Sequence, residues 1–243
     1  MIEVQGLSKS FGKLQAVQDV WFSAPDGQIT GLLGPNGAGK STTLRMLYTL
    51  LKPASGTATI DGFDIIHASI EVQRRIGVLA DARGLYERLT TRENIRYYGR
   101  LHGLEGEQLE NQIDKLLHLL DMQEIADRKT GGFSTGEKLK VAIARALVHN
   151  PPNVLLDEPT NGLDVMSTRA MRQFILRLRE EGKCVLFTSH IMQEVAALCD
   201  QVVIISKGKV SATGSPDALR QQTGKDNLED AFVAALGSEE GLE

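Results

Sequence analysis

Glycines are concentrated in residues 34–42, where they lead directly into a lysine and two hydroxyl side chains. The segment reads Gly-Pro-Asn-Gly-Ala-Gly-Lys-Ser-Thr, follows the apolar residues 29–33 and precedes a helical pattern. Glycines let the backbone curl so that successive N–H groups point toward polyphosphate oxygens at the start of a helix. Lys40 can reach the outer phosphates, and the hydroxyl of Ser41 can bind Mg²⁺. The pattern predicts a nucleoside triphosphate site built from Asn36, Gly37, Ala38, Gly39, Lys40, Ser41 and Thr42.

Two carboxylates, Asp157 and Glu158, come directly after the apolar residues 153–156. In a phosphate-loop fold, a strand that neighbours the strand before the loop presents a carboxylate at its C-terminal end, where it can hold Mg²⁺. Asp157 has that position. Glu158 points in a different direction and can polarise a water molecule that attacks the γ-phosphate. The sequence therefore predicts a metal ligand followed by a general base.

The composition limits the class of protein. The chain has 243 residues, of which 42% are hydrophobic and 24% charged, and its net charge is −4. These values are ordinary for a soluble globular protein and give no electrostatic reason to expect nucleic-acid binding. Residues 1–4 do not resemble a secretory signal, and no apolar run approaches the roughly 20 residues of a membrane span. We expect a cytoplasmic protein in which Cys184 and Cys199 are buried and reduced.

The chain divides into segments of different periodicity. Residues 2–60 alternate short apolar segments with turns, as strands do. From residue 90 to about residue 150 the period is helical: Thr90 and Glu93 have the spacing of a capping box, and apolar residues recur three or four apart over 109–120. After residue 153, strand and helix patterns alternate, which predicts a parallel sheet covered by helices.

Two further motifs extend the pattern. One opens with Phe-Ser-Thr-Gly-Glu-Lys at 133–138, and the other reads Leu-Leu-Asp-Glu-Pro-Thr-Asn-Gly-Leu-Asp at 155–164. Together with the glycine-rich loop, their order and spacing resemble the nucleotide-binding subunit of ATP-binding cassette (ABC) transporters, over essentially the whole chain. The resemblance implies an α/β, P-loop NTPase fold of the ABC-cassette type. Such a fold has a mostly parallel sheet core, an antiparallel β subdomain and a helical insert.

On this resemblance we expect one cassette in four parts. Residues 1–89 would hold the N-terminal β subdomain and the P-loop core, and residues 90–150 the helical subdomain with the signature loop. Residues 151–215 would complete the ATPase core, and residues 216–243 would form a C-terminal helical tail.

The resemblance also implies roles around the nucleotide. Phe11 matches the aromatic residue that stacks on adenine, and Val17 matches a residue that lines the same face. His190, after the apolar residues 185–189, matches the switch histidine that hydrogen-bonds the γ-phosphate. The alternatives are a turn-packing aromatic side chain for Phe11 and a polar cap at a strand end for His190.

Three positions match residues that act across a dimer. Ser134 and Gly136 match signature-loop residues that contact the γ-phosphate of a nucleotide held by the opposite subunit, and Asp164 lies in the loop that crosses the dimer axis. The family usually reads Leu-Ser-Gly-Gly-Gln at the signature, whereas this chain reads Phe-Ser-Thr-Gly-Glu. Ser134 and Glu137 also have capping-box spacing, so that a helix start is the structural alternative. The carboxylate of Glu137 would add negative charge where a partner's phosphate arrives, unless Lys138 offsets it.

Asp81 stands where the family usually carries a glutamine that touches Mg²⁺ and senses the membrane partner. A carboxylate is a harder ligand than an amide but has a shorter reach. The expected metal ligands are therefore Ser41, Asp157 and Asp81. A helix of a membrane subunit would dock in the groove formed by this loop and residues 86–90.

Taken together, these features predict an ATPase that uses ATP and Mg²⁺ and pairs head to tail with a second copy of the same subunit. It would drive integral-membrane permease subunits from the inner face of the cell membrane. Residues 84–90 and 227–232 resemble exporters of the ABC-2 type, sodium-efflux subunits among them. The main alternative is a non-transport cassette ATPase, such as one serving iron–sulfur assembly. DNA-repair and translation-associated cassettes fit less well, because the chain lacks heptad arms, a zinc module and a second cassette.

Overall fold

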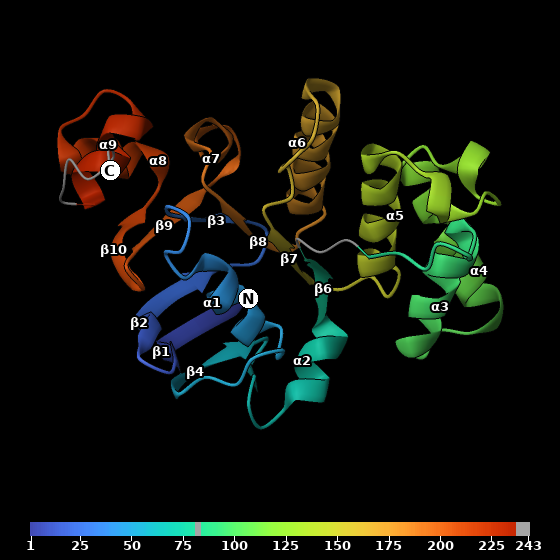
Figure 1. Cartoon of the computed structure of the whole chain (residues 1–243), viewed down its shortest axis with the longest axis horizontal. Coiled ribbons are helices and arrows are strands. Elements are labelled where there is room, and N and C mark those ends of the chain that lie inside the picture. Colours follow the sequence, from blue (N-terminus) through green and yellow to red (C-terminus); the bar gives the residue numbers. More distant parts are fainter. Residues whose placement is uncertain (81–83, 237–243) are drawn as a thin grey trace.

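The computed structural model describes residues 1–80 and 84–236, and its strands form two sheets (Figure 1). The larger sheet holds, in spatial order, β10 (Lys209–Gly214), β9 (Gln201–Ser206), β3 (Ile29–Leu33), β8 (Cys184–Ser189), β7 (Asn153–Asp157) and β6 (Ile76–Leu79). Its strands pair in parallel, except that β10 runs antiparallel to β9. The smaller sheet is antiparallel and holds β2 (Leu14–Ala24), β1 (Ile2–Phe11), β4 (Ser55–Ile60) and β5 (Phe63–Asp64). The carboxyl ends of β3, β8 and β7 thus share one edge, where ligands of α/β folds bind.

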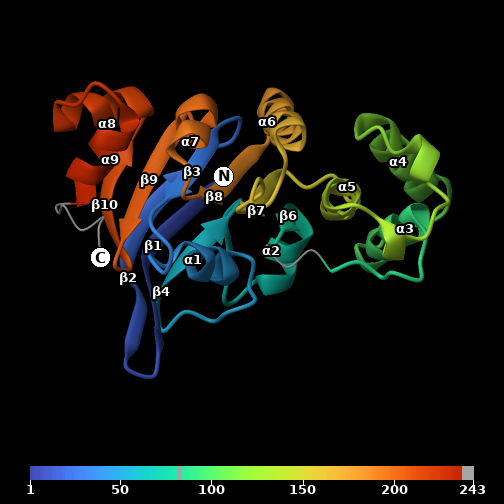
Figure 2. The ribbon, with the colours of Figure 1, turned by 45° about the horizontal axis from the view of Figure 1, so that its top comes forward.

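The helices fall into groups around the larger sheet. They are α1 (Lys40–Leu47), α2 (Ser69–Arg75), α3 (Thr91–Leu101), α4 (Gly106–Leu119), α5 (Thr135–Leu147), α6 (Val165–Glu180), α7 (Met192–Leu198), α8 (Pro216–Thr223) and α9 (Leu228–Leu236), with 3-10 turns at Gln123–Ile125 and Thr130–Gly132. In Figure 1, α6 to α9 lie above the larger sheet and the smaller sheet lies below it. Figure 2 shows α3, α4 and α5 as a separate group beyond β6.

Alternate residues of the central strands face two separate cores. Leu156 of β7 and Phe187 of β8 pack in the core that contains residues of α3 to α9, whereas Leu155 and Leu186 pack in the core shared with α1, α2 and the smaller sheet. Strand side chains alternate between faces, and a sheet buried on both faces needs apolar residues at every position. This explains why β7 and β8 read as continuous apolar runs that end in polar residues.

The capping box expected at the start of α3 is present. The hydroxyl oxygen of Thr90 accepts a hydrogen bond from the Glu93 N–H at 3.1 Å, and the Glu93 carboxylate accepts one from the Thr90 N–H at 2.8 Å. The apolar residues spaced along α4, such as Leu109, Ile113 and Leu117, are buried as the helical period predicts.

Two elements, α2 and β10, were not apparent in the sequence. The first has seven residues and only Val72 buried, so it is too short to show a helical period. The second is an edge strand of small and polar residues. None of the helices in residues 1–80 and 84–236 combines the length and apolar character of a membrane span.

Candidate nucleotide-binding site

The glycine-rich loop joins β3 to α1, and two of its glycines touch other parts of the backbone. A Cβ atom at Gly34 would lie 2.2 Å from the carbonyl oxygen of Ile205, and one at Gly39 would lie 2.5 Å from that of Ala16. Gly39 also has a φ of 108°, in the left-handed region, and provides no side-chain cap for α1. N–H groups at the start of α1 are therefore left to an anion, as at helix N-termini that bind phosphate.

Lys40 folds back across this loop. Its ammonium group donates hydrogen bonds to the carbonyl oxygens of Gly34 (2.7 Å) and Pro35 (3.1 Å), and it lies 3.7 Å from a carboxylate oxygen of Glu158. The side chain is only 4% exposed, and burial lowers its pKa, while the charges of Glu158 and Asp157 act in the opposite direction. A buried ammonium held by carbonyls can exchange them for phosphate oxygens, which form stronger, charge-assisted bonds.

Asp157 connects the phosphate loop with β8 through hydrogen bonds. Its Oδ1 accepts hydrogen bonds from the hydroxyls of Ser41 (3.0 Å) and Thr188 (2.7 Å). The Thr188 hydroxyl in turn accepts one from the Glu158 N–H at 2.9 Å. Sequence reasoning did not single out Thr188, because a threonine in a strand is unremarkable until its register opposite Asp157 is known.

The strand that carries Asp157 is not the neighbour of the strand before the loop. The sequence analysis placed them side by side, but β8 lies between β3 and β7. Asp157 reaches the loop because Ser41, in the first turn of α1, extends across to it. The paired oxygens of Ser41 and Asp157 suit Mg²⁺, which prefers oxygen ligands and usually keeps several water molecules. Elsewhere in the described chain, as here, no three His, Cys, Asp or Glu side chains form a metal-binding group.

Glu158 and His190 face each other just beyond the strand ends. Nδ1 of His190 lies 3.3 Å from Oε2 of Glu158, whose other carboxylate oxygen faces Lys40. Glu158 has a φ of 45°, a left-handed conformation that is unfavourable for a residue with a Cβ atom. The structure thus brings together Lys40, Ser41, Asp157, Glu158 and His190, which come from three separate segments of the chain.

The two residues expected around adenine differ in exposure. Phe11 ends β1 at the tip of the β1–β2 hairpin, and its ring is 47% exposed, with the Lys9 ammonium 5.6 Å from the ring centroid. Figure 2 shows this hairpin extending beyond the rest of the smaller sheet. Val17 is buried in β2, where it packs beside Gly39 of the loop. The ring of Phe11 is therefore accessible to a base, whereas Val17 is a buried residue that packs against the phosphate loop.

The signature residues lie at the start of α5, on the far side of β6 and β7 from α1 (Figure 1). The hydroxyl oxygen of Ser134 accepts a hydrogen bond from the Glu137 N–H at 3.2 Å, and the Glu137 carboxylate accepts one from the Ser134 N–H at 2.8 Å. The second capping box is therefore present as well. Arg128 lies 3.4 Å from the same carboxylate. The Ser134 N–H lowers the pKa of Glu137, whose charge is thus shared with its own helix.

The start of α6 lies against the signature helix. Asp164 caps α6 by accepting hydrogen bonds from the N–H (2.8 Å) and hydroxyl (2.9 Å) of Ser167. A Cβ atom at Gly136 would lie 3.4 Å from that Ser167 hydroxyl oxygen. Two of the positions expected to act across a dimer, Gly136 and Asp164, therefore meet at one surface through Ser167.

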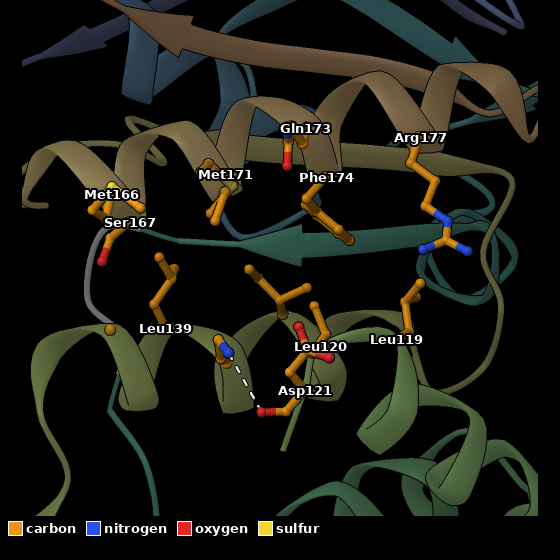
Figure 3. Close-up of a pocket in the computed structure, with 14 residues that line it drawn as sticks. Leu119, Leu120, Asp121, Leu139, Met166, Ser167, Met171, Gln173, Phe174 and Arg177 are labelled. Carbon is orange, nitrogen blue, oxygen red and sulfur yellow. Dashed lines mark hydrogen bonds between the residues drawn. The ribbon is translucent and has the colours of Figure 1, made fainter. Parts of the chain in front are cut away.

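An apolar cavity of about 490 Å³ separates α5 from α6 behind this surface (Figure 3). Leu139 on α5 and Met171 and Phe174 on α6 line it, with Ser167 at one end and Arg177 at the other. It contains none of the phosphate-loop residues.

Asp81 lies outside the described residues, as does Arg83, and the structure gives no account of either. The loop that follows is ordered by Asn94, a buried residue that sequence reasoning missed. Its side-chain oxygen accepts a hydrogen bond from the Tyr86 N–H at 3.1 Å, and its amide nitrogen donates to the carbonyl oxygens of Tyr86, Leu89 and Thr90. An asparagine one turn inside a helix gives no sequence signal of such a clamp.

Comparison with known proteins gives consistent matches. A family model described as ABC transporter matches residues 17–161. The ABC transporter ATP-binding protein NatA of Bacillus subtilis is 45% identical over 224 residues, covering 92% of this chain and 91% of its own length. The bacitracin transport ATP-binding protein BcrA of Bacillus licheniformis is 38% identical over 93% of this chain and 73% of its own. The linearmycin resistance ATP-binding protein LnrL of Bacillus subtilis is 34% identical over 98% and 79%.

Solved structures agree with the sequence matches. An ATP-binding subunit of an ABC transporter superimposes with a TM-score of 0.89 at 30% identity, covering 97% of this chain and 99% of that one. A dimeric, post-hydrolysis ATP-binding cassette bound to ADP and Pi superimposes with a TM-score of 0.78 at 26% identity, covering 88% and 98%.

Proposed function

Because this chain belongs to the ABC transporter family, as an ATP-binding subunit that hydrolyses ATP, we propose that it powers an exporter through the closing and opening of a dimer. ATP would close two copies head to tail, and hydrolysis would reopen them, since the γ-phosphate is the ligand that makes the differential contacts. The observation that carries the proposal is the convergence of the lysine, hydroxyl, carboxylate and imidazole groups at one sheet edge.

The pocket supports a role for each of these groups. Lys40 and the N–H groups of the loop would bind the outer phosphates. Ser41 and Asp157 would hold Mg²⁺, which neutralises charge on the phosphates when bound. Glu158 would accept the proton of the attacking water, and His190 would hydrogen-bond the γ-phosphate. Phe11 would stack on the adenine.

A second copy would complete the site. Ser134 is exposed at the N-terminus of α5, a helix on the far side of β6 and β7 from α1, so a nucleotide of another copy is the ligand it suits. Asp164 would lie at the dimer axis beside it. The internal hydrogen bonds of Glu137 reduce the repulsion that its charge would exert on the partner's phosphate. A related cassette that is dimeric when bound to ADP and Pi supports the pairing of two copies.

A membrane permease would dock beside the loop that Asn94 holds. A groove of about 330 Å³ opens there between α3, α5 and the β6 region, lined in part by Tyr48, Gln73, Tyr98, His102, Arg145 and His149. The exposed Tyr86 and Tyr97 are in edge-to-face contact with centroids 5.2 Å apart, and Tyr97 in turn contacts Tyr98 of the groove at 5.5 Å. A rigid loop with exposed aromatic side chains suits a partner helix.

Affinity purification from the host's membranes tests the docking. The tagged wild-type chain is expected to co-purify with an integral-membrane protein, and the variant Tyr86→Ser with Tyr97→Ser is expected to lose it while keeping ATPase activity. Trp21→Ser, which removes an equally exposed aromatic side chain from the smaller sheet, is the matched control. Equal recovery of the membrane protein with the double variant would rule this surface out.

The names of the relatives suggest which transported substrates to test first. The resemblance to sodium-efflux subunits makes sodium the first ion to test, and the names of BcrA and LnrL make antibiotics the second class. Vesicles that contain the permease and this subunit should take up ²²Na⁺ on addition of ATP, and vesicles with Glu158→Gln should not. A cassette of the iron–sulfur type is the second candidate, and it predicts that no membrane protein co-purifies.

A further inference from the structure

A carboxylate lies buried directly behind the proposed reacting pair. Glu194, on α7, is 1% exposed, and sequence analysis assigned it no role. Its Oε2 accepts hydrogen bonds from the hydroxyls of Thr160 (2.6 Å) and Ser189 (3.4 Å). Its Oε1 lies 3.8 Å from Nη2 of Arg172 on α6. One carboxylate thus joins the turn after β7, the last residue of β8 and the helices α6 and α7.

These bonds lie at the edge of the sheet, where the pairing of β7 with β8 ends and Ser189 still pairs with Leu33 of β3. The ladder between β7 and β8 ends with Asp157 opposite Thr188. Glu158 and His190 both come after that last pair. The hydroxyl oxygen of Thr188 accepts a hydrogen bond from the N–H of Glu158, the first residue after the last pair. The Glu194 carboxylate then connects Thr160, two residues after Glu158, with Ser189, directly before His190.

Each of the two tied segments contains one member of the reacting pair. Thr160 lies two residues after Glu158, in a turn where its carbonyl oxygen accepts a hydrogen bond from the Leu163 N–H at 3.2 Å. Ser189 directly precedes His190, and its hydroxyl oxygen accepts a hydrogen bond from the Ile191 N–H at 3.0 Å. Moving the Glu194 carboxylate would therefore release both turns together.

A role in packing alone does not account for this side chain. A buried carboxylate costs free energy unless it is well paired, and an apolar residue of similar size would often serve packing as well. The ion pair with Arg172 is long, and Nε of Arg172 is itself a buried donor without a partner in the described chain. The short bond to Thr160 is the strongest contact that Glu194 makes.

We propose that Glu194 is a positioning residue for ATP hydrolysis, which holds the Thr160 and Ser189 turns so that Glu158 and His190 keep their facing arrangement. The inference rests on the roles proposed above for Glu158 and His190. Misplacement of reacting groups by even 1 Å can cost up to about 100-fold in rate. Binding of ATP depends on the loop and Lys40, which Glu194 does not touch.

The test compares steady-state ATP hydrolysis among matched variants. Glu194→Ala is expected to lower kcat about tenfold and to leave KM for ATP within about twofold. Glu194→Gln should recover most of kcat, because an amide oxygen can still accept the Thr160 hydrogen bond. Asp200→Ala is the control. Like Glu194, Asp200 contacts an arginine of α6, but its carboxylate accepts a hydrogen bond from the Ile29 N–H at the opposite end of β3. It should leave kcat and KM unchanged.

A second variant tests the proposal even if Glu194→Ala does not fold. Thr160→Val removes only the hydroxyl and should lower kcat in the same way, and combining it with Glu194→Ala should cost little more than either alone. The proposal would be overturned if Glu194→Ala or Thr160→Val kept a kcat near that of the wild type. It would also be overturned if Asp200→Ala lowered kcat equally, or if Glu194→Gln did not recover activity. Full activity of Glu158→Gln, measured alongside, would instead overturn the proposed catalytic pair.

Discussion

The phosphate-loop half and the signature half of the proposed ATP site are built in opposite ways. In the first, the buried Asp157 accepts hydrogen bonds from Ser41 and Thr188, and the buried Lys40 lies 3.7 Å from Glu158. In the second, Ser134 is exposed and its polar atoms are satisfied by Glu137, three residues away. An apolar cavity separates the signature helix from α6.

This difference indicates which step each half serves. A pocket that is assembled within one chain can bind ATP without help. A helix start that is satisfied locally and lies at the surface gains a ligand only when another molecule brings one. Binding and hydrolysis should therefore be separable by mutation, and the following variants test how far that separation holds.

The largest effect is expected from Glu158→Gln, within the phosphate-loop half. Loss of the general base should slow hydrolysis by about 100-fold or more, with ATP binding retained. Gel filtration with ATP should then show a trapped dimer. Glu107→Gln, at an exposed position on α4, is the control. Near-normal turnover would remove Glu158 from its proposed role.

Lys40→Ala should instead weaken ATP binding itself. Hydrogen bonds to charged groups are worth about 1.5–3 kcal/mol, which corresponds to roughly a 10- to 100-fold loss of affinity. Titration calorimetry with ATP and Mg²⁺ measures it, with Lys115→Ala on α4 as the control for loss of one positive charge. Unchanged affinity would mean that the loop does not bind the nucleotide through this lysine.

Ser134→Ala tests the signature half. It should lower hydrolysis about tenfold, the scale of one lost contact to a charged group, and leave ATP affinity of the single subunit unchanged. The variant also loses a helix cap, worth about 1 kcal/mol. Ser215→Ala, which removes the equivalent cap from α8, controls for that loss. Equal hydrolysis by the two variants would contradict a role for Ser134 across the dimer.

The smallest effect concerns the region where the two halves are joined. His149, after α5, stacks on His102 with ring centroids 3.5 Å apart and donates through Nε2 to the Ile76 carbonyl oxygen. Burial, and then His102 and Lys183, lower the pKa of His149 to about 4, against the effect of the Ile76 carbonyl. The unfolded chain therefore binds more protons below pH 6.5, so stability should fall as the pH drops from 6.5 to about 4.

The expected loss is on the order of 2 kcal/mol, measured by urea unfolding at a series of pH values. His149→Gln should flatten this dependence, whereas His118→Gln, at an exposed position on α4, should not. An unaltered pH profile in His149→Gln would show that the buried imidazole is not the group that titrates.

Local features of this protein were predictable from the sequence. The glycine-rich loop, the capping boxes at Thr90 and Ser134 and the apolar strand before Asp157 each depend on residues within a few positions of one another. The roles of Ser134, Phe11 and Asp81 came only from resemblance to a family and stay predictions. Asp81, moreover, lies outside the described residues.

Contacts between distant segments were not predictable in the same way. The insertion of β8 between β3 and β7, the clamp formed by Asn94 and the buried carboxylate of Glu194 left no local pattern. Glu194 bonds a residue 34 positions away, and even the Asn94 clamp, which spans four to eight positions, depends on the path of the loop before α3. In each case the choice of partner depends on strand order, chain path and burial.

The sequence by itself determined that the chain has a phosphate loop, a carboxylate pair and a helix start with its own cap. Backbone conformation and capping obey short-range sterics and hydrogen bonding, which few residues suffice to specify. Only the tertiary structure decided that Thr188 lies opposite Asp157, that His190 faces Glu158 and that α5 lies on the far side of β6 and β7 from α1. Those arrangements follow from burying both faces of one sheet, a condition that the whole chain satisfies at once.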